Sequence, residues 1–216
     1  FKGEKIIGVL KKLVGERNIE DLSIGFTAVA TDLNSERELW FNRGSLFDAI
    51  RASVAVPMIF EPIISGGRLL VDGGLINPVP IAPTLNNDSR LLIAVDLNTE
   101  PEGHVSAEDS QQQAQPAETT NEYRLKLVKF IESVFPSGPE SSPDEVPDIF
   151  DLMMRSMDAM QTTISRFRQA AYKPDVSINI PRDRCRFFEF YRARELIDFG
   201  YRRAERALDA FEKEDS

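Results

Sequence analysis

The residues best suited to do chemistry are three consecutive ones, Asp72, Gly73 and Gly74, which follow the apolar residues 69–71. An aspartate carboxylate can take a proton from an attacking hydroxyl when the two oxygens are held about 2.6 to 3.2 Å apart and water is excluded. The glycines allow a sharp turn behind the carboxylate, with positive φ where it is needed and no Cβ in the way. Taken alone, the pattern predicts a turn at the end of a strand, where an aspartate is more often a turn residue than a base.

Other catalytic side chains are scarce. The only histidine, His104, lies in a polar segment where we expect a solvated loop residue. The only cysteine, Cys185, excludes an internal disulfide and a multi-cysteine metal site and suits a reducing compartment. Catalysis must therefore rest on carboxylates, hydroxyls and backbone groups, and we expect neither a cofactor nor a metal.

The sequence around the aspartate carries an ordered set of short motifs. They are Ala52-Ser53-Val54-Ala55-Val56-Pro57, Phe60-Glu61-Pro62, Asp72-Gly73-Gly74 and Asn77-Pro78. In this order they resemble the patatin-like acyl hydrolases, in particular bacterial members related to lysophospholipases of the neuropathy-target-esterase type. The family has one residue between the Asn and the Pro, which are adjacent here. Residues 172–176 and the helical segment 195–201 also look like the family's C-terminal part, so the resemblance covers most of the chain except two polar loops.

The resemblance implies a three-layer α/β fold with a mostly parallel central sheet, here lacking its N-terminal nucleophile-bearing part. It implies hydrolysis of a lipid or lysophospholipid ester by a Ser-Asp dyad, with Asp72 as the base and the backbone of Gly73 and Gly74 shaping the motif. In the family the serine stands in Gly-x-Ser-x-Gly and a glycine-rich loop binds the oxyanion.

Neither the serine motif nor the glycine-rich loop occurs in the sequence. Near the aspartate motif, Ser45 is expected to cap a helix and Ser53 to pack within one. We therefore expect an upstream segment of the same protein to complete the site, and this chain alone to be inactive.

Two alternatives remain open. The chain could be a non-catalytic fragment or a degenerate patatin-like interaction domain, because the nucleophile motif is missing. It could also hold Mg²⁺ for phosphoryl transfer, because Asp32, Asp72 and Asp96 each end a predicted strand and carboxylates at one sheet edge can bind the ion.

Composition limits the partners and the location. The 216 residues include 35 acidic and 26 basic side chains, for a net charge of -9, which opposes non-specific binding to nucleic acid. No apolar run approaches the roughly 18 residues that a transmembrane helix needs, and the N-terminus lacks the apolar core of a signal peptide. We expect a cytoplasmic protein, peripheral to the inner face of the membrane.

Periodicity predicts alternating helices and strands. Helices are expected at 1–20, 49–56, 123–135, 149–171 and 193–211, and strands at 23–31, 39–41, 69–71, 91–95 and 174–180. Residues 91–95 are uniformly apolar and are expected to be buried on both faces of a partly parallel sheet. We divide the chain into a part of the catalytic domain at 1–98, a mobile polar loop at 99–121, and helices and a last strand completing the domain at 122–212, with a second flexible loop at 136–147.

Three surface expectations follow. The methionines are expected to pack in the core rather than line an acyl pocket, and the arginines to form a solvated face rather than meet lipid headgroups. These residues are Met153, Met154, Met157, Met160, Arg182, Arg184, Arg186, Arg192 and Arg194. If leading strands are missing, we expect either an incompletely covered sheet or a second chain that pairs with it.

Overall fold

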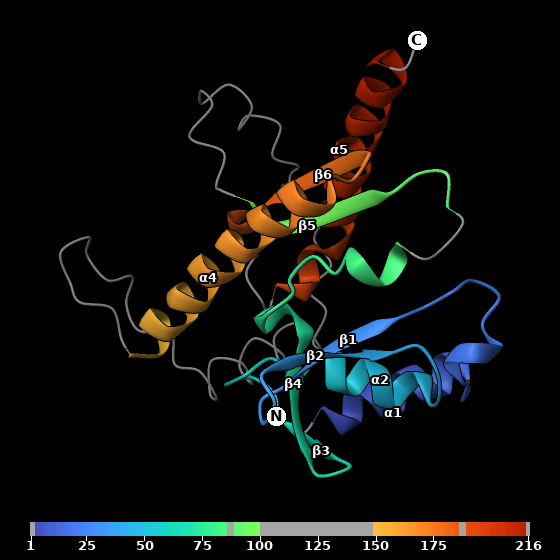
Figure 1. The fold of residues 1–216 in the computed structure, drawn as a ribbon, viewed down its shortest axis with the longest axis vertical. Helices are drawn as coiled ribbons and strands as arrows, with labels where there is room; N and C mark the ends of the chain where they lie inside the picture. Colours follow the sequence, from blue (N-terminus) through green and yellow to red (C-terminus); the bar gives the residue numbers. More distant parts are fainter. Residues whose placement is uncertain (1–2, 86–88, 100–148, 186–188, 215–216) are drawn as a thin grey trace, which may run out of the picture.

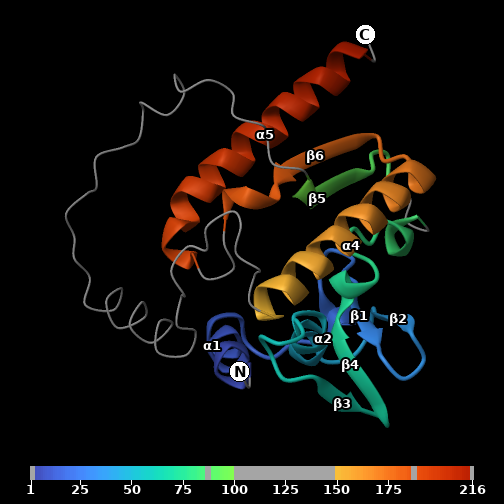
Figure 2. The same ribbon diagram turned by 90° about the vertical axis from the view of Figure 1, so that its left-hand side faces the viewer.

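The chain folds into helices packed against two sheets (Figures 1 and 2). The computed structural model describes residues 3–85, 89–99, 149–185 and 189–214. The N-terminal part forms a four-stranded sheet backed by helices α1 and α2, and the C-terminal part forms a two-stranded sheet between helices α4 and α5. The α/β character implied by the resemblance is confirmed.

The larger sheet has the strand order β2-β1-β4-β3 and is antiparallel at every pairing. Its strands are β1 (Ala28–Asp32), β2 (Arg37–Phe41), β3 (Ile63–Ser65) and β4 (Arg68–Asp72). All five residues of β1 are buried, because the strand lies between β2 and β4 with α2 packed across it. The register sets Asp72, the last residue of β4, opposite Ala30 of β1.

Helix α2 (Leu46–Ser53) packs closely on this sheet. Ser45 caps it as predicted, because its hydroxyl accepts a hydrogen bond from the Asp48 N–H at 3.3 Å. The small residue Ala52 is buried against Ala30 and Leu70, so the helix backbone approaches the strands that carry the site. Helix α1 (Glu4–Val14) packs in turn against α2.

Strands β5 (Ile93–Thr99) and β6 (Val176–Pro181) pair in parallel. Helix α4 (Ile149–Tyr172) packs on β5 and helix α5 (Ala193–Glu214) on β6. Val95 is 52% exposed and Leu97 is 61% exposed, so the prediction that residues 91–95 are buried on both faces is wrong. The reason is that α5 packs mainly against β6 and leaves this apolar face of β5 exposed. Among the described residues this sheet is incompletely covered, which is one of the two outcomes expected from the sequence.

Helix α4 is the long helix that periodicity predicts, but it turns a different side toward the protein. Ser165 is fully buried and Thr162 is nearly so, whereas Ile149 and Phe167 are each 74% exposed. The buried hydroxyls have partners, since Thr162 donates to a backbone carbonyl and Ser165 donates to Asp96. A polar face of α4 is therefore buried against the sheets, whereas the large apolar side chains Ile149 and Phe167 are exposed.

The other elements agree with the prediction at their centres and differ at their ends. The first helix is shorter than 1–20, β1 begins at Ala28 rather than at 23, and β2 is the predicted hairpin partner. The loops expected at 99–121 and 136–147 and the helix expected at 123–135 lie outside the described residues, apart from Thr99, which ends β5. Among the described helices, none is long and apolar enough to cross a membrane.

Candidate functional site

Asp72 is held in place through its backbone on both sides. Its N–H donates to the carbonyl oxygen of Ala55 at 3.0 Å, and its carbonyl oxygen accepts from the buried Thr31 hydroxyl at 3.0 Å. These bonds tie the end of β4 to the segment after α2 and to the central strand β1. The Asp72 carboxylate thus projects from a rigid point of the fold.

The two oxygens of the Asp72 carboxylate differ in their environment. Oδ1 accepts a hydrogen bond from the Gly74 N–H at 2.6 Å, whereas Oδ2 accepts none in the described part of the chain. Burial raises the pKa of Asp72, and the Gly74 hydrogen bond opposes this rise. A carboxylate with one free oxygen and a raised pKa is a better proton acceptor than an ordinary surface aspartate.

The two glycines are required because there is no room for a Cβ, not because their backbone angles are unusual. Neither has positive φ, and both lie in the short 3-10 turn Gly73–Leu75 that follows β4. A Cβ at Gly73 would overlap the carbonyl oxygen of Val29, and one at Gly74 would lie 3.0 Å from Asp72 Oδ1. The positive φ that the sequence allowed for is not used, and close approach to β1 and to the carboxylate explains both residues.

A pocket of about 370 Å³ opens over the Asp72 carboxylate. Much of its wall is apolar and comes from the segment before β1, from α2 and from the chain after the turn. The apolar side chains are Phe26, Ala28, Val29, Ile50, Val54, Pro78 and Pro80. Ser53 and Asn77 supply polar groups to the same wall. The pocket offers an apolar surface for a hydrocarbon group beside a carboxylate.

Sequence reasoning missed two residues near this pocket. Ser53 was expected only to pack within a helix, but as the last residue of α2 it lines the pocket. Glu38 of β2 binds the side chain of Asn77 and an arginine 130 residues away in the chain, so no local pattern could have indicated it. Ser53 could have been suspected, because it stands within the quoted Ala52–Pro57 motif.

The other two strand-end aspartates do not join Asp72. Asp32 binds Ser35 and the Asn34 N–H in its own turn and lies opposite Leu70 in the sheet register. Asp96 belongs to β5 in the second sheet. Within the described ranges no group of three His, Cys, Asp or Glu side chains is arranged to hold a metal ion. The convergence on which the magnesium alternative depended is therefore absent from the described residues.

Asp96 lies at a second pocket of about 380 Å³, which has polar walls. Asp96 is 3% exposed, and its carboxylate accepts hydrogen bonds from the Ser165 hydroxyl, from Gln169 Nε2 at 2.7 Å and from the Asn98 N–H at 2.8 Å. With both oxygens occupied, Asp96 joins β5 to α4.

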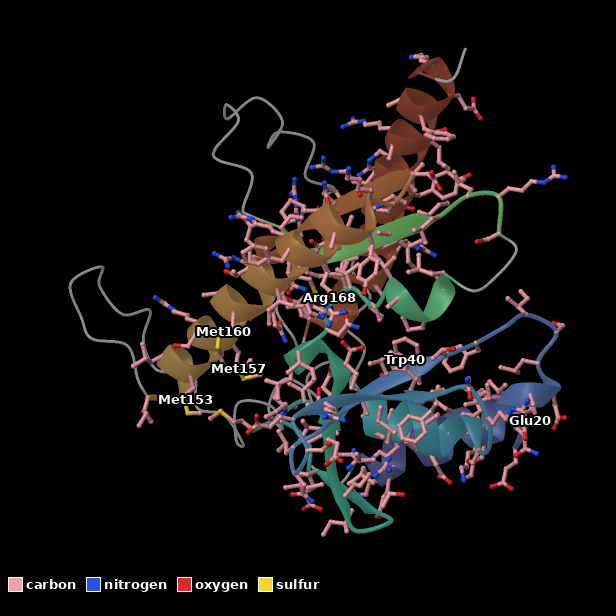
Figure 3. All side chains as sticks on the ribbon, in the orientation of Figure 1. Glu20, Trp40, Met153, Met157, Met160 and Arg168 are labelled. Carbon is pink, nitrogen blue, oxygen red and sulfur yellow. The ribbon has the colours of Figure 1, made fainter. Side chains whose placement is uncertain are left out.

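The methionine expectation is wrong for two residues. Met153 and Met160 are about half exposed on the N-terminal half of α4, where Figure 3 shows them with Met157. None of the methionines lines the Asp72 pocket.

The arginines of the C-terminal part are partly engaged with neighbours. Arg192 pairs with Glu189 and Glu195, and Arg184 lies 4.6 Å from the Phe199 ring centre. Arg186 lies outside the described residues.

Comparison with known proteins identifies the family. The sequence profile of patatin-like phospholipases, "Patatin-like phospholipase", matches residues 1–85. An NTE family protein of Mycobacterium tuberculosis is 34% identical over 263 aligned positions that take in 100% of this chain and 71% of the relative. The chain belongs to the NTE family of patatin-like phospholipases. A second M. tuberculosis NTE family protein is 33% identical over 96 residues, covering 44% of this chain and 16% of its own.

A mouse patatin-like phospholipase domain-containing protein 7 is 29% identical over 104 residues, covering 47% of this chain and 8% of that protein. Membership in the NTE family places the chain among lipid acyl hydrolases. The matched residues 1–85 include the Asp72 turn and every residue of its pocket.

Proposed function

We propose that this chain supplies the Asp half of a Ser-Asp dyad that hydrolyses phospholipid or lysophospholipid esters. The observation that carries the proposal is Asp72 itself, which lines a largely apolar pocket and has one oxygen bound to the Gly74 N–H and the other without a donor among the described residues. Family membership supports the substrate class.

In the proposed reaction Asp72 Oδ2 accepts the proton of a serine hydroxyl as that oxygen attacks the ester carbonyl. The alcohol then leaves with a proton from Asp72, and water hydrolyses the acyl-enzyme by the same route. Burial of Asp72 helps, because it raises the pKa of the carboxyl and so brings it closer to the pKa of the serine hydroxyl whose proton it takes. The apolar wall beside it would hold the acyl chain.

The serine and the oxyanion donors are proposed to come from a segment upstream of these residues. Residues 1–98 and 122–212 are then parts of one catalytic domain, with the polar segment 99–121 between them. We further propose that the protein works at the inner face of the membrane as a peripheral protein, because its ester substrates are there. The sequence supports an upstream origin of the serine, since it contains no Gly-x-Ser-x-Gly.

The test is Asp72→Asn in the intact protein, assayed on a lysophospholipid and on a short-chain ester. Loss of a general base should lower kcat about 10²- to 10⁴-fold. Asp32→Asn is the matched control, because that aspartate also ends a strand but binds Ser35 and the Asn34 N–H in its own turn and pairs with Arg68, and it does not line the Asp72 pocket. Full activity of the Asp72→Asn variant would refute the proposal.

The missing serine motif favours one rival, a non-catalytic interaction domain. A fluorophosphonate probe separates the two. Labelling of the intact protein at a serine outside this chain supports the dyad, and no labelling of the intact protein supports the rival. Labelling of Ser53 would contradict the proposed origin of the nucleophile, because Ser53 lines the Asp72 pocket.

A further inference from the structure

One carboxylate behind the Asp72 turn joins three elements of the fold. Glu38 of β2 accepts hydrogen bonds at Oε2 from Trp40 Nε1 at 2.9 Å and from Asn77 Nδ2 at 2.8 Å. Its other oxygen, Oε1, forms an ion pair with Arg168 of α4. Figure 3 labels two of these partners, Arg168 on α4 and Trp40 on β2.

Glu38 is ionised in this setting. Burial raises the pKa of its carboxyl, but the hydrogen bonds from Trp40, Asn77 and Arg168 together hold the pKa below its usual range. The Glu38 side chain is 17% exposed and that of Arg168 is 26% exposed, so the pair is screened less than a surface ion pair. The link between β2 and α4 therefore persists at neutral pH.

Glu38 also fixes the orientation of the Asn77 amide. Only Nδ2 can donate to a carboxylate, so Oδ1 must point away. Asn77 is 2% exposed and its Oδ1 has no partner in the described structure. A buried acceptor without a partner is unfavourable, so an opposing interaction must hold the amide in place. Among the described residues, the bond to Glu38 is the one that does so.

Asn77 is in turn bonded to the turn that carries the site. Its backbone N–H donates to the Gly73 carbonyl oxygen at 2.9 Å, and the next N–H after Gly73, that of Gly74, donates to Asp72 Oδ1 at 2.6 Å. Two hydrogen bonds and one peptide link thus separate the Asn77 side chain from the Asp72 carboxylate. A shift of Asn77 would move the donor that binds Asp72.

We propose that Glu38 is a positioning residue for Asp72: through Asn77 it fixes the turn that binds the carboxylate, and through Arg168 it ties that turn to α4. The catalytic meaning of this position rests on the proposed function, whereas the position itself does not.

The test follows the protonation of Asp72 without an activity assay. The intact protein is labelled with ¹⁵N-glycine, and the Gly74 amide shift is titrated with pH, because this N–H binds the carboxylate directly. In Glu38→Ala and in Asn77→Ala the Gly74 bond should weaken. Since that bond lowers the pKa of Asp72, the midpoint of the Gly74 titration should rise, by about 1 pH unit. The double variant should rise no further than either single one.

Two control variants separate positioning from general loosening of the fold. Trp40→Phe removes another donor to the same Glu38 oxygen but leaves the Asn77 bond, and should leave the midpoint unchanged. Glu20→Ala removes a carboxylate that binds the Gly44 N–H at 2.7 Å, and Figure 3 shows Glu20 apart from Trp40 and Arg168. This variant should also leave the midpoint unchanged.

An unchanged midpoint in folded Glu38→Ala, or additive shifts in the double variant, would overturn the proposal. If Glu38→Ala does not fold, Glu38→Gln replaces it. The Gln keeps an oxygen for Asn77 but loses the ion pair, so a smaller rise is expected and no rise would overturn the proposal. Because the titration needs no turnover, inactivity of the enzyme cannot be mistaken for failure of the positioning.

Discussion

Asp72 and Asp96 each follow a valine within a strand, but the fold surrounds them differently. Asp96 is almost fully buried and receives three hydrogen bonds, so both of its oxygens are occupied. Asp72 is partly buried and receives one, so one oxygen is left for another donor. A carboxylate saturated with donors holds two elements together, whereas one that is desolvated and under-bonded can take a proton.

The strongest test of this difference is the same substitution at both positions. Asp96→Asn should lower the free energy of unfolding by about 2–3 kcal/mol, because a charge-assisted acceptor of Ser165 and Gln169 becomes an amide with its own donors. Asp72→Asn should cause no loss, because the Asn oxygen still accepts from Gly74. Urea denaturation at pH 7 measures both, and equal losses would remove the distinction.

The turn beside Asp72 should tolerate no added methyl group. Gly73→Ala should cost about 2 kcal/mol, because the new Cβ would overlap the Val29 carbonyl oxygen and neither backbone can easily move. Gly25→Ala is the control, since a Cβ there meets nothing within 4 Å and φ is not positive. Similar thermal stability of the two variants would mean that the turn is looser than the structure indicates.

A smaller effect is expected at the helix that supports Asp96. Ser165→Ala removes one of three donors and should lower the free energy of unfolding by about 1 kcal/mol. Thr163→Ala, two residues away, removes an exposed hydroxyl bonded to the Ala159 carbonyl oxygen and should change stability very little. The two urea midpoints can be compared directly, and a larger loss at Thr163 would reverse the assignment of the buried face.

The smallest effect concerns the pH dependence of stability. Because burial raises the pKa of Asp72, the folded state binds more protons than the unfolded state between the ordinary Asp pKa and the raised one. The contribution of Asp72 to stability therefore falls as pH rises through that window. Asp72→Asn should remove this fall, so at pH values above the window the variant should have a higher free energy of unfolding than the wild type. Below the ordinary value of about 3.9 the gain should vanish.

These differences mark the limit of sequence reasoning about the fold. The predicted centres of β2, β4, β6 and α5 were right, because period-2 and period-3.6 patterns report which residues can share a face. The prediction failed where burial depends on a neighbour. Residues 91–95 are apolar throughout, yet one face of β5 is exposed, and α4 buries Thr162 and Ser165 because Asn98 and Asp96 lie opposite with acceptors.

The sequence by itself determined the family, the Asp72 turn and the class of chemistry, because these depend on residue types at fixed short spacing. Only the tertiary structure decided which aspartate keeps an oxygen without a donor among the described residues, since Val71-Asp72 and Val95-Asp96 look alike until their donors are in place. It also brought Ser53 into the pocket and set Glu38 behind the turn. Both depend on contacts between segments far apart in the chain, where no local pattern constrains the pairing.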